Sequence, residues 1–126
     1  MRIESLDHVV LTVADIENTC AFYEAVLGMK HVEADGRHAL HFGSQKLNLH
    51  QKDRTFEPKA QHPTPGSADL CFITDLPMPS VLLHLAHCDV PVVEGPVDRS
   101  GATGRLLSVY IRDLDANLVE IANRVE

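Results

Sequence analysis

The 126-residue sequence has no tryptophan, and aromatic residues make up only 5% of it. Proteins that bind single-stranded nucleic acids usually stack the bases on aromatic rings, so we do not expect such a platform here. Basic residues are also scarce, because 11 Lys and Arg stand against 18 Asp and Glu and leave a net charge of −7. Nucleic acids and anionic membranes favour basic surfaces, and we therefore expect neither as a partner.

Cysteine is rare as well. Cys20, Cys71 and Cys88 form no Cys-x-x-Cys pair and are odd in number, which indicates reduced thiols in a reducing compartment. The opening residues MRIESLDHVV contain no apolar signal-peptide core, and no apolar run approaches the length of a membrane span. These features predict a cytoplasmic protein.

Two stretches of the sequence predict the same order of elements, β-α-β-β-β, from their periodicity and turn residues. The first stretch predicts strands over 5–13, 29–35, 37–43 and 45–51 and a helix over 16–28, and the second predicts strands over 68–74, 90–96, 105–112 and 117–123 and a helix over 77–89. Residues 53–67 carry Pro, Gly and charge without periodicity and indicate a linker. We therefore predict one α+β domain over 1–126, made of the modules 1–52 and 68–126.

Polar residues recur at matching positions of otherwise apolar strands. Aligning the first strand of each stretch places His8 over Asp69, and aligning the last strands places Asn48 over Glu120. Side chains alternate between the two faces of a strand. If the helices cover the apolar faces, these four polar side chains lie on the opposite side of the sheet.

His8, Asp69 and Glu120 are the candidate metal ligands. One imidazole and two carboxylates suit a divalent ion such as Zn²⁺, Ni²⁺, Mn²⁺ or Fe²⁺. His50 shares a strand face with Asn48, so it is a candidate base or a reserve ligand.

Other interpretations of these residues stay open. His8 is also compatible with a hydrogen-bonded groove residue, and Asp69 with a loop cap. Glu120 needs a partner because burying an unpaired carboxylate is costly. Arg105 or Arg112 on the neighbouring strand would serve as well as a metal.

The sequence also resembles a known family. LDHVVLTVADIENTCAFYEAVLGMK resembles the opening of the vicinal oxygen chelate superfamily of glyoxalases, bleomycin resistance proteins and dioxygenases. The segments QKLNLHQ, HPTPGSADLCFIT and SVYIRDLDANLVEIAN look most like its small members of the glyoxalase-domain-containing-protein-5 and virulence-protein kind. This resemblance implies two βαβββ modules in a mixed-sheet open barrel, a chelated divalent metal and a homodimer.

The resemblance implies His8 and Glu120 as metal ligands, whereas Asp69 stands where family enzymes commonly carry histidine. Asn48 stands where glyoxalase I carries a glutamate that acts as a base. Since an amide cannot abstract a proton, His50 would have to take that role.

We therefore expect a metal-dependent enzyme that acts on a small substrate chelated through vicinal oxygens, with a glyoxalase-like lyase or isomerase as the nearest class. His50 and Tyr110 are the expected catalytic residues, and Asn48, Ser108 and Arg105 the expected substrate-binding residues. The alternatives are a metal-free or weakly metallated binding protein, and a thiol transferase or dioxygenase.

Overall fold

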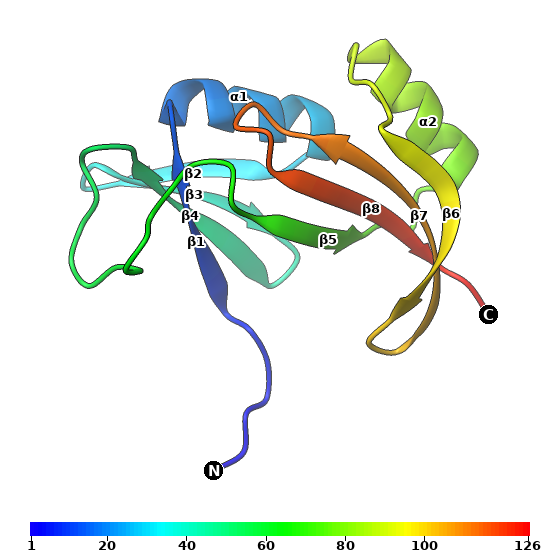
Figure 1. Cartoon of the computed structure of the whole chain (residues 1–126), viewed down its shortest axis with the longest axis horizontal. Coiled ribbons are helices and arrows are strands. Elements are labelled where there is room, and N and C mark those ends of the chain that lie inside the picture. Colours follow the sequence, from blue (N-terminus) through cyan, green and yellow to red (C-terminus); the bar gives the residue numbers. More distant parts are fainter. The chain divides into compact units, whose positions relative to one another are not determined.

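The structure, a computed structural model that describes all of residues 1–126, repeats one order of elements twice (Figure 1). The first unit, residues 1–66, contains β1 (His8–Val13), α1 (Ile16–Leu27), β2 (Lys30–Ala34), β3 (Arg37–Phe42) and β4 (Gln45–Gln51). The second unit, residues 67–126, contains β5 (Asp69–Ile73), α2 (Met78–His87), β6 (Glu94–Gly101), β7 (Gly104–Arg112) and β8 (Leu118–Arg124). The predicted element order and the α+β class are confirmed.

The sheet of the first unit has the strand order β1-β4-β3-β2. Strand β1 is parallel to β4, and the other neighbours are antiparallel, so the sheet is mixed. A parallel pair needs a long crossover connection, which here includes α1. Helix α1 contacts β2, β3 and β4, and the buried core includes Leu11, Val13, Cys20, Tyr23, Leu40, Leu47 and Leu49. The opposite side of this sheet, which carries His8, Arg37, Lys46, Asn48 and His50, is called the Asn48 face below.

Helix α1 has a clear signal at each end. The Asp15 side chain accepts a hydrogen bond from the backbone N–H of Asn18 at 2.9 Å, which caps the first turn. Gly28 ends the helix with φ 66, in the left-handed region that glycine adopts without strain. The two ends fix the helix so that Cys20 and Tyr23 face the sheet, and both are buried.

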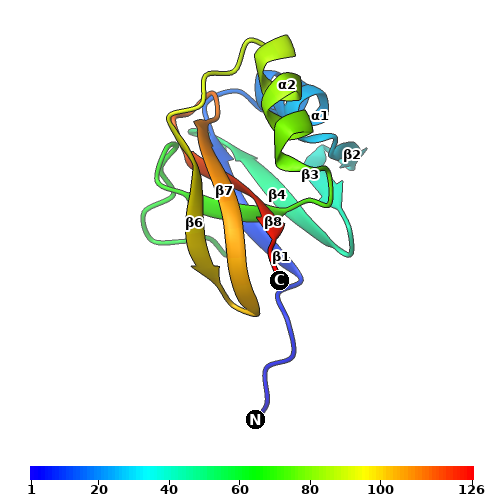
Figure 2. The ribbon, with the colours of Figure 1, turned by 90° about the vertical axis from the view of Figure 1, so that its right-hand side faces the viewer.

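The second unit repeats this plan with the strand order β5-β8-β7-β6, and Figure 2 shows β6, β7 and β8 of this sheet. Strands β5 and β8 are parallel, and β8-β7 and β7-β6 are antiparallel. One face of the sheet carries the fully buried Val109, Ile111 and Val119. The other, which carries Asp69, Cys71, Ser108, Tyr110 and Glu120, is called the Glu120 face below. Neither α1 nor α2 is long and apolar enough to cross a membrane.

Strand β6 begins later than the sequence predicts. We expected a strand over 90–96, whereas β6 spans Glu94–Gly101 and its register against β7 shifts near the start. Gly95 lies at this shift with φ 106, and a Cβ there would come within 2.5 Å of the Ser108 carbonyl oxygen. The prediction failed because the apolar run 90–93 mimics a strand, whereas the backbone joins the ladder only where glycine permits the irregularity.

The turn between β7 and β8 holds Ala116 at φ 66, a conformation that glycine adopts more easily than alanine. Replacing Ala116 with Gly should therefore stabilise the protein by roughly 1 kcal/mol, because the left-handed region costs an L-residue about that much. Urea unfolding of both proteins measures the difference. The same substitution at Ala102, which has no positive φ, should not stabilise, and a destabilised Ala116→Gly variant would contradict the strain argument.

Candidate functional site

Glu120 lies at the centre of the Glu120 face, between strands β5 and β7. Its direct neighbours across the sheet are Cys71 on β5 and Tyr110 on β7. The buried Ser108 hydroxyl donates a hydrogen bond to Glu120 Oε2 at 2.6 Å. Such a bond to a carboxylate is short and strong, so Ser108 fixes the carboxylate orientation.

Arg105 and Arg112, the alternatives to a metal as partners of Glu120, have other contacts. Arg105 lies 3.8 Å from Asp98, in an exposed ion pair. Arg112 donates to the backbone carbonyl of Ala116 at 3.3 Å. Glu120 therefore has a hydroxyl donor and no arginine ion pair, which leaves its charge available to a cation.

The Cys71 thiol responds to the negative charge of this face. Partial desolvation by the surrounding protein, then the charge of Glu120, a hydrogen bond to Glu120 and the charge of Asp69, raise the pKa of Cys71 to about 11. The thiol is therefore protonated near neutral pH. Repulsion of a thiolate and attraction of a cation are two consequences of the same local field.

Asp69 and Glu120 both line one hollow of about 470 Å³ in the second unit, together with Tyr110 and Arg99. Arg99 Nε donates to the Tyr110 hydroxyl oxygen at 2.8 Å, and Arg99 Nη2 lies 2.6 Å from Glu94 Oε2. Because its oxygen accepts from Arg99, the phenol keeps its own proton for donation to a ligand. The hollow thus combines the carboxylates of Asp69 and Glu120 with an oriented hydroxyl donor, and it is also lined by Arg112 and by Glu94, whose carboxylate pairs with Arg99.

His8 begins β1 in the first unit and is partly exposed. Its Nδ1 lies 2.8 Å from Asp7 Oδ1, and this hydrogen bond lowers the pKa of Asp7. A charged carboxylate can only accept, so Nδ1 carries a proton, and in the neutral form of the ring Nε2 keeps its lone pair. A carboxylate that orients a histidine in this way is typical of metal-binding imidazoles.

His50 and Asn48 line a second hollow, of about 780 Å³, on the Asn48 face. The Nδ1 atom of His50 is buried and has no hydrogen-bond partner. The His50 ring meets the Phe56 ring edge to face at 5.0 Å, and the Arg37 guanidinium lies 4.9 Å from the centre of the Phe56 ring. The His50 ring therefore borders a site with positive charge and an aromatic wall.

The pKa of His50 is lowered by burial, then by the positive charges of Arg37 and Lys59. Replacing Arg37 with Gln should raise this pKa toward the ordinary value of about 6.5, whereas Arg2→Gln, in the exposed N-terminal segment, should leave it unchanged. Titration of the ring protons by NMR measures the shift, and an unmoved His50 pKa in the Arg37 variant would refute this explanation.

The lowered pKa of His50 also makes the stability of the folded protein depend on pH. As the pH falls, the unfolded chain takes up the proton before the folded protein does. The contribution of His50 to stability is therefore fully present above about pH 6.5 and declines as the pH falls below it.

The sequence-predicted residues thus fall into groups. Asp69, Tyr110 and Glu120 share the hollow of the second unit, and Asn48 and His50 share that of the first unit. Ser108 is buried against Glu120, and Arg105 is exposed beside Asp98.

Sequence reasoning missed Arg99, because it lies beyond the strand predicted over 90–96. It also missed a cluster of three potential metal ligands in the first unit, Cys20, His31 and His38, whose ligand atoms all lie within 4.8 Å of one another.

Comparison with known proteins agrees with this architecture. The family model of the Glyoxalase/Bleomycin resistance protein/Dioxygenase superfamily matches residues 5–121, and the chain belongs to that superfamily. The two-module fold with two mixed four-stranded sheets fits this assignment.

Individual relatives cover almost the whole chain. The virulence protein STM3117 of Salmonella typhimurium is 55% identical over 99% of this chain and 88% of its own length, and its crystal structure, covering 99% of this chain and 100% of that one, gives a TM-score of 0.97. The glyoxalase domain-containing protein RDO1 of Mycosarcoma maydis is 50% identical over 98% of this chain and 70% of its own. The integron cassette protein VCH_CASS1 of V. cholerae is 54% identical, with a TM-score of 0.96 over 99% of this chain and 98% of that one.

Proposed function

We propose that this protein is a divalent-metal-dependent enzyme that acts on a small substrate chelated through two vicinal oxygens, with a glyoxalase-like lyase or isomerase as the nearest class. One observation carries the proposal. Asp69 and Glu120 line a single hollow beside the Tyr110 hydroxyl, and Glu120 is oriented by Ser108 rather than neutralised by an arginine. Superfamily membership supports the same class of chemistry.

Glu120, Asp69 and His8 are the proposed ligands. Glu120 offers the carboxylate oxygen that Ser108 does not hold, and His8 offers Nε2, since Asp7 holds Nδ1. Two carboxylates and one imidazole form an oxygen-rich donor set that fits Mn²⁺, Fe²⁺, Ni²⁺ or Zn²⁺. The bound ion would supply Lewis-acid polarisation of the substrate oxygens.

The remaining residues would handle protons and position the substrate. His50 would accept a proton, because its lowered pKa keeps the imidazole neutral near pH 7. Tyr110, with its oxygen held by Arg99, would donate a hydrogen bond to a substrate oxygen. Asn48 would bind the substrate through its amide, and Arg105 would contribute positive charge at the exposed edge.

A second candidate function is small-molecule binding without chemistry. The 780 Å³ hollow with Phe56 and Arg37 favours this function. An aromatic wall and a guanidinium suit a ligand that has an apolar body and one anionic group, and they need no metal to bind it. The two functions differ in whether binding needs the ion.

Binding of a small hydroxamate, which chelates through two vicinal oxygens, separates them. We expect calorimetric binding in the presence of Mn²⁺ and its loss after chelator treatment or in Glu120→Gln protein. Metal-independent binding that survives this substitution would favour the binding protein. Oxygen uptake with catechols and consumption of a thiol co-substrate test the dioxygenase and thiol-transferase alternatives.

We also propose that the chain forms a homodimer, as its family resemblance implies. Sedimentation velocity at micromolar concentration should give the mass of two chains. A monomer under these conditions would contradict this part of the proposal.

A further inference from the structure

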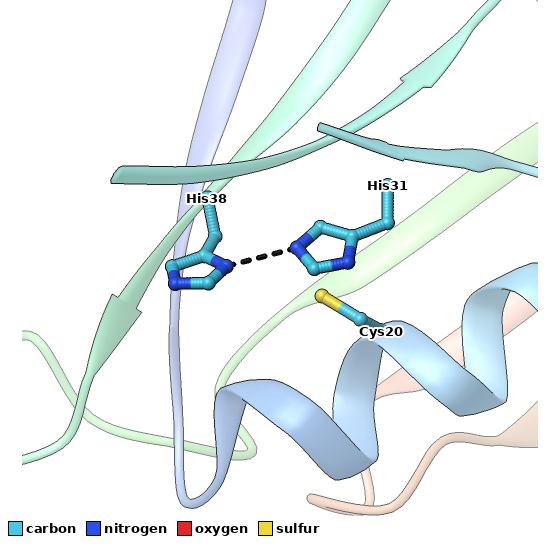
Figure 3. A group of neighbouring side chains, drawn as sticks. All are labelled: Cys20, His31 and His38. Carbon is cyan, nitrogen blue, oxygen red and sulfur yellow. Dashed lines mark hydrogen bonds between the residues drawn. The ribbon is translucent and has the colours of Figure 1, made fainter. Parts of the chain in front are cut away.

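Three metal-ligand side chains converge beneath helix α1, on the sheet side opposite the Asn48 face. Cys20 comes from the buried side of α1, His31 from β2 and His38 from β3 (Figure 3). Figure 3 shows the Cys20 sulfur pointing toward the imidazole rings. None of these residues takes part in the proposed function, so the cluster needs its own explanation.

The spacing of the ligand atoms is close to that of a metal site. All three lie within 4.8 Å of one another, and His31 Nε2 is 2.8 Å from His38 Nδ1. Around a tetrahedral zinc ion, ligand nitrogen and sulfur atoms are about 3.3–3.7 Å apart, as bond lengths of about 2.0 and 2.3 Å require. Small rotations of the rings and of the thiol therefore suffice.

The hydrogen bond between the two imidazoles joins the same two atoms that would bind an ion. His31 Nε2 and His38 Nδ1 share one proton across 2.8 Å, in rings that lie 18° from parallel. If a cation took the place of this proton, the proton would move through solvent to the outward nitrogen of the ring that lacks one, so that each neutral ring carries its proton on the outward nitrogen and keeps a lone pair toward the ion.

Carboxylates surround the cluster without being part of it. Glu33 Oε2 lies 3.7 Å from His38 Nε2, the nitrogen that faces away from His31. A carboxylate beside the outward nitrogen of a histidine, whose other nitrogen faces the ion, is the usual support of a metal-binding histidine.

The Cys20 thiol is the least accessible of the three groups. Burial, followed by the negative charges of Glu17 and Glu24, raises the pKa of Cys20 to about 11. Without a cation the thiol is therefore protonated near neutral pH, and its reaction with an alkylating reagent is slow but measurable at higher pH. The same carboxylates attract a cation, which would displace the thiol proton.

We propose that Cys20, His31 and His38 form a second metal site, separate from the Glu120 ligand set, which binds a thiolate-preferring transition-metal ion of the zinc class and links α1 to β2 and β3. One thiolate and two imidazoles favour Zn²⁺, Co²⁺ or copper over Mn²⁺ or Mg²⁺. Binding releases one proton, from the Cys20 sulfur to solvent, and the fourth coordination position is left to water. Affinity for the ion therefore increases with pH.

Titration of chelator-treated protein with Co²⁺ tests this site, because a thiolate bound to Co²⁺ gives a charge-transfer absorption that carboxylate ligands do not give. We expect one equivalent to produce the band, and one equivalent of Zn²⁺ to remove it. Cys20→Ala and His31→Gln should abolish the band. Glu33→Gln should weaken affinity by about 10- to 100-fold, as expected for an outer partner of a ligand.

Two controls separate this site from the proposed function. Cys71→Ala removes the thiol beside Glu120, and Glu120→Gln disables the other ligand set, so both should retain the band. A band that survives Cys20→Ala, or no band in the unmodified protein, would overturn the proposal. If the unmodified protein gives the Co²⁺ band but does not bind the hydroxamate in the presence of Mn²⁺, that result would count against the proposed function alone.

A second readout does not depend on the folding of any variant. The rate at which Cys20 of the unmodified protein is alkylated at about pH 8.5 can be measured by mass spectrometry. This rate should fall about tenfold when Zn²⁺ is present at ten times its dissociation constant. Alkylation of Cys88 serves as the internal reference. An unchanged rate at Cys20 would refute thiolate coordination.

Discussion

Glu120→Gln should reduce affinity for Mn²⁺ by at least about 100-fold, since even the outer partners of metal ligands are worth about 10- to 100-fold. The substitution preserves the shape of the side chain and its ability to accept the Ser108 hydrogen bond, but removes the negative charge. Calorimetric titration of chelator-treated protein measures the loss.

Asp98→Asn is the matched control, because Asp98 is an exposed carboxylate of the same unit whose contact is with Arg105. This variant should bind Mn²⁺ like the unmodified protein. Equal affinity in the Glu120 variant and the control would remove Glu120 from the ligand set. A parallel readout is the pKa of the Cys71 thiol, which should fall when the charge of Glu120 is removed.

Asn117→Ala should destabilise the protein by about 2–4 kcal/mol, because each buried polar group left without a partner costs about 1–3 kcal/mol. Asn117 is 2% exposed and connects two segments. Its Oδ1 accepts from the backbone N–H of Ala68 at 2.8 Å, and its Nδ2 donates to Asp113 Oδ2 at 2.8 Å. The substitution therefore breaks the bond that ties the start of β5 to the turn before β8.

Urea unfolding measures the effect, with Asn18→Ala as the comparison. Asn18 lies on the exposed side of α1, and its truncation should change stability by no more than about 0.5 kcal/mol. If both variants lowered the free energy of unfolding by similar amounts, the buried hydrogen bonds of Asn117 would not stabilise this turn.

Period-2 alternation predicted the faces of both sheets correctly. Leu47 and Leu49 are buried, and Asn48 between them lies on the opposite face. The same alternation separates Val119 and Ile121 from Glu120. These assignments succeed because a shift of one residue would move every apolar side chain of the strand to the other face. Only one alternation therefore buries the apolar side chains.

Contacts that depend on irregular backbone were not predictable in this way. Arg99 reaches Tyr110 only because β6 shifts its register near Gly95, and no propensity scale encodes that shift. The Ser108 contact with Glu120 was also missed, because Ser108 had been assigned to substrate. Register between β7 and β8, rather than residue type, places them together.

The Cys20, His31 and His38 cluster had a partial signal in the sequence. Asp35-Gly36 is a typical two-residue hairpin turn, and with it His31 and His38 become diagonal neighbours on one face. The missing step was the helix. The sequence alone identifies Cys20 only as a reduced thiol, and the packing of α1 on the sheet is what brings its sulfur near the rings.

The proposed oxygen-rich metal site that includes Glu120 is tested most directly by counting bound Mn²⁺ with electron paramagnetic resonance. Mn²⁺ prefers carboxylate oxygens to thiolates, so it reports on this set rather than on the Cys20 cluster. We expect one Mn²⁺ per chain in Cys20→Ala protein and none when Glu120→Gln is added. No bound Mn²⁺ in Cys20→Ala protein, or one ion retained in the double variant, would contradict it.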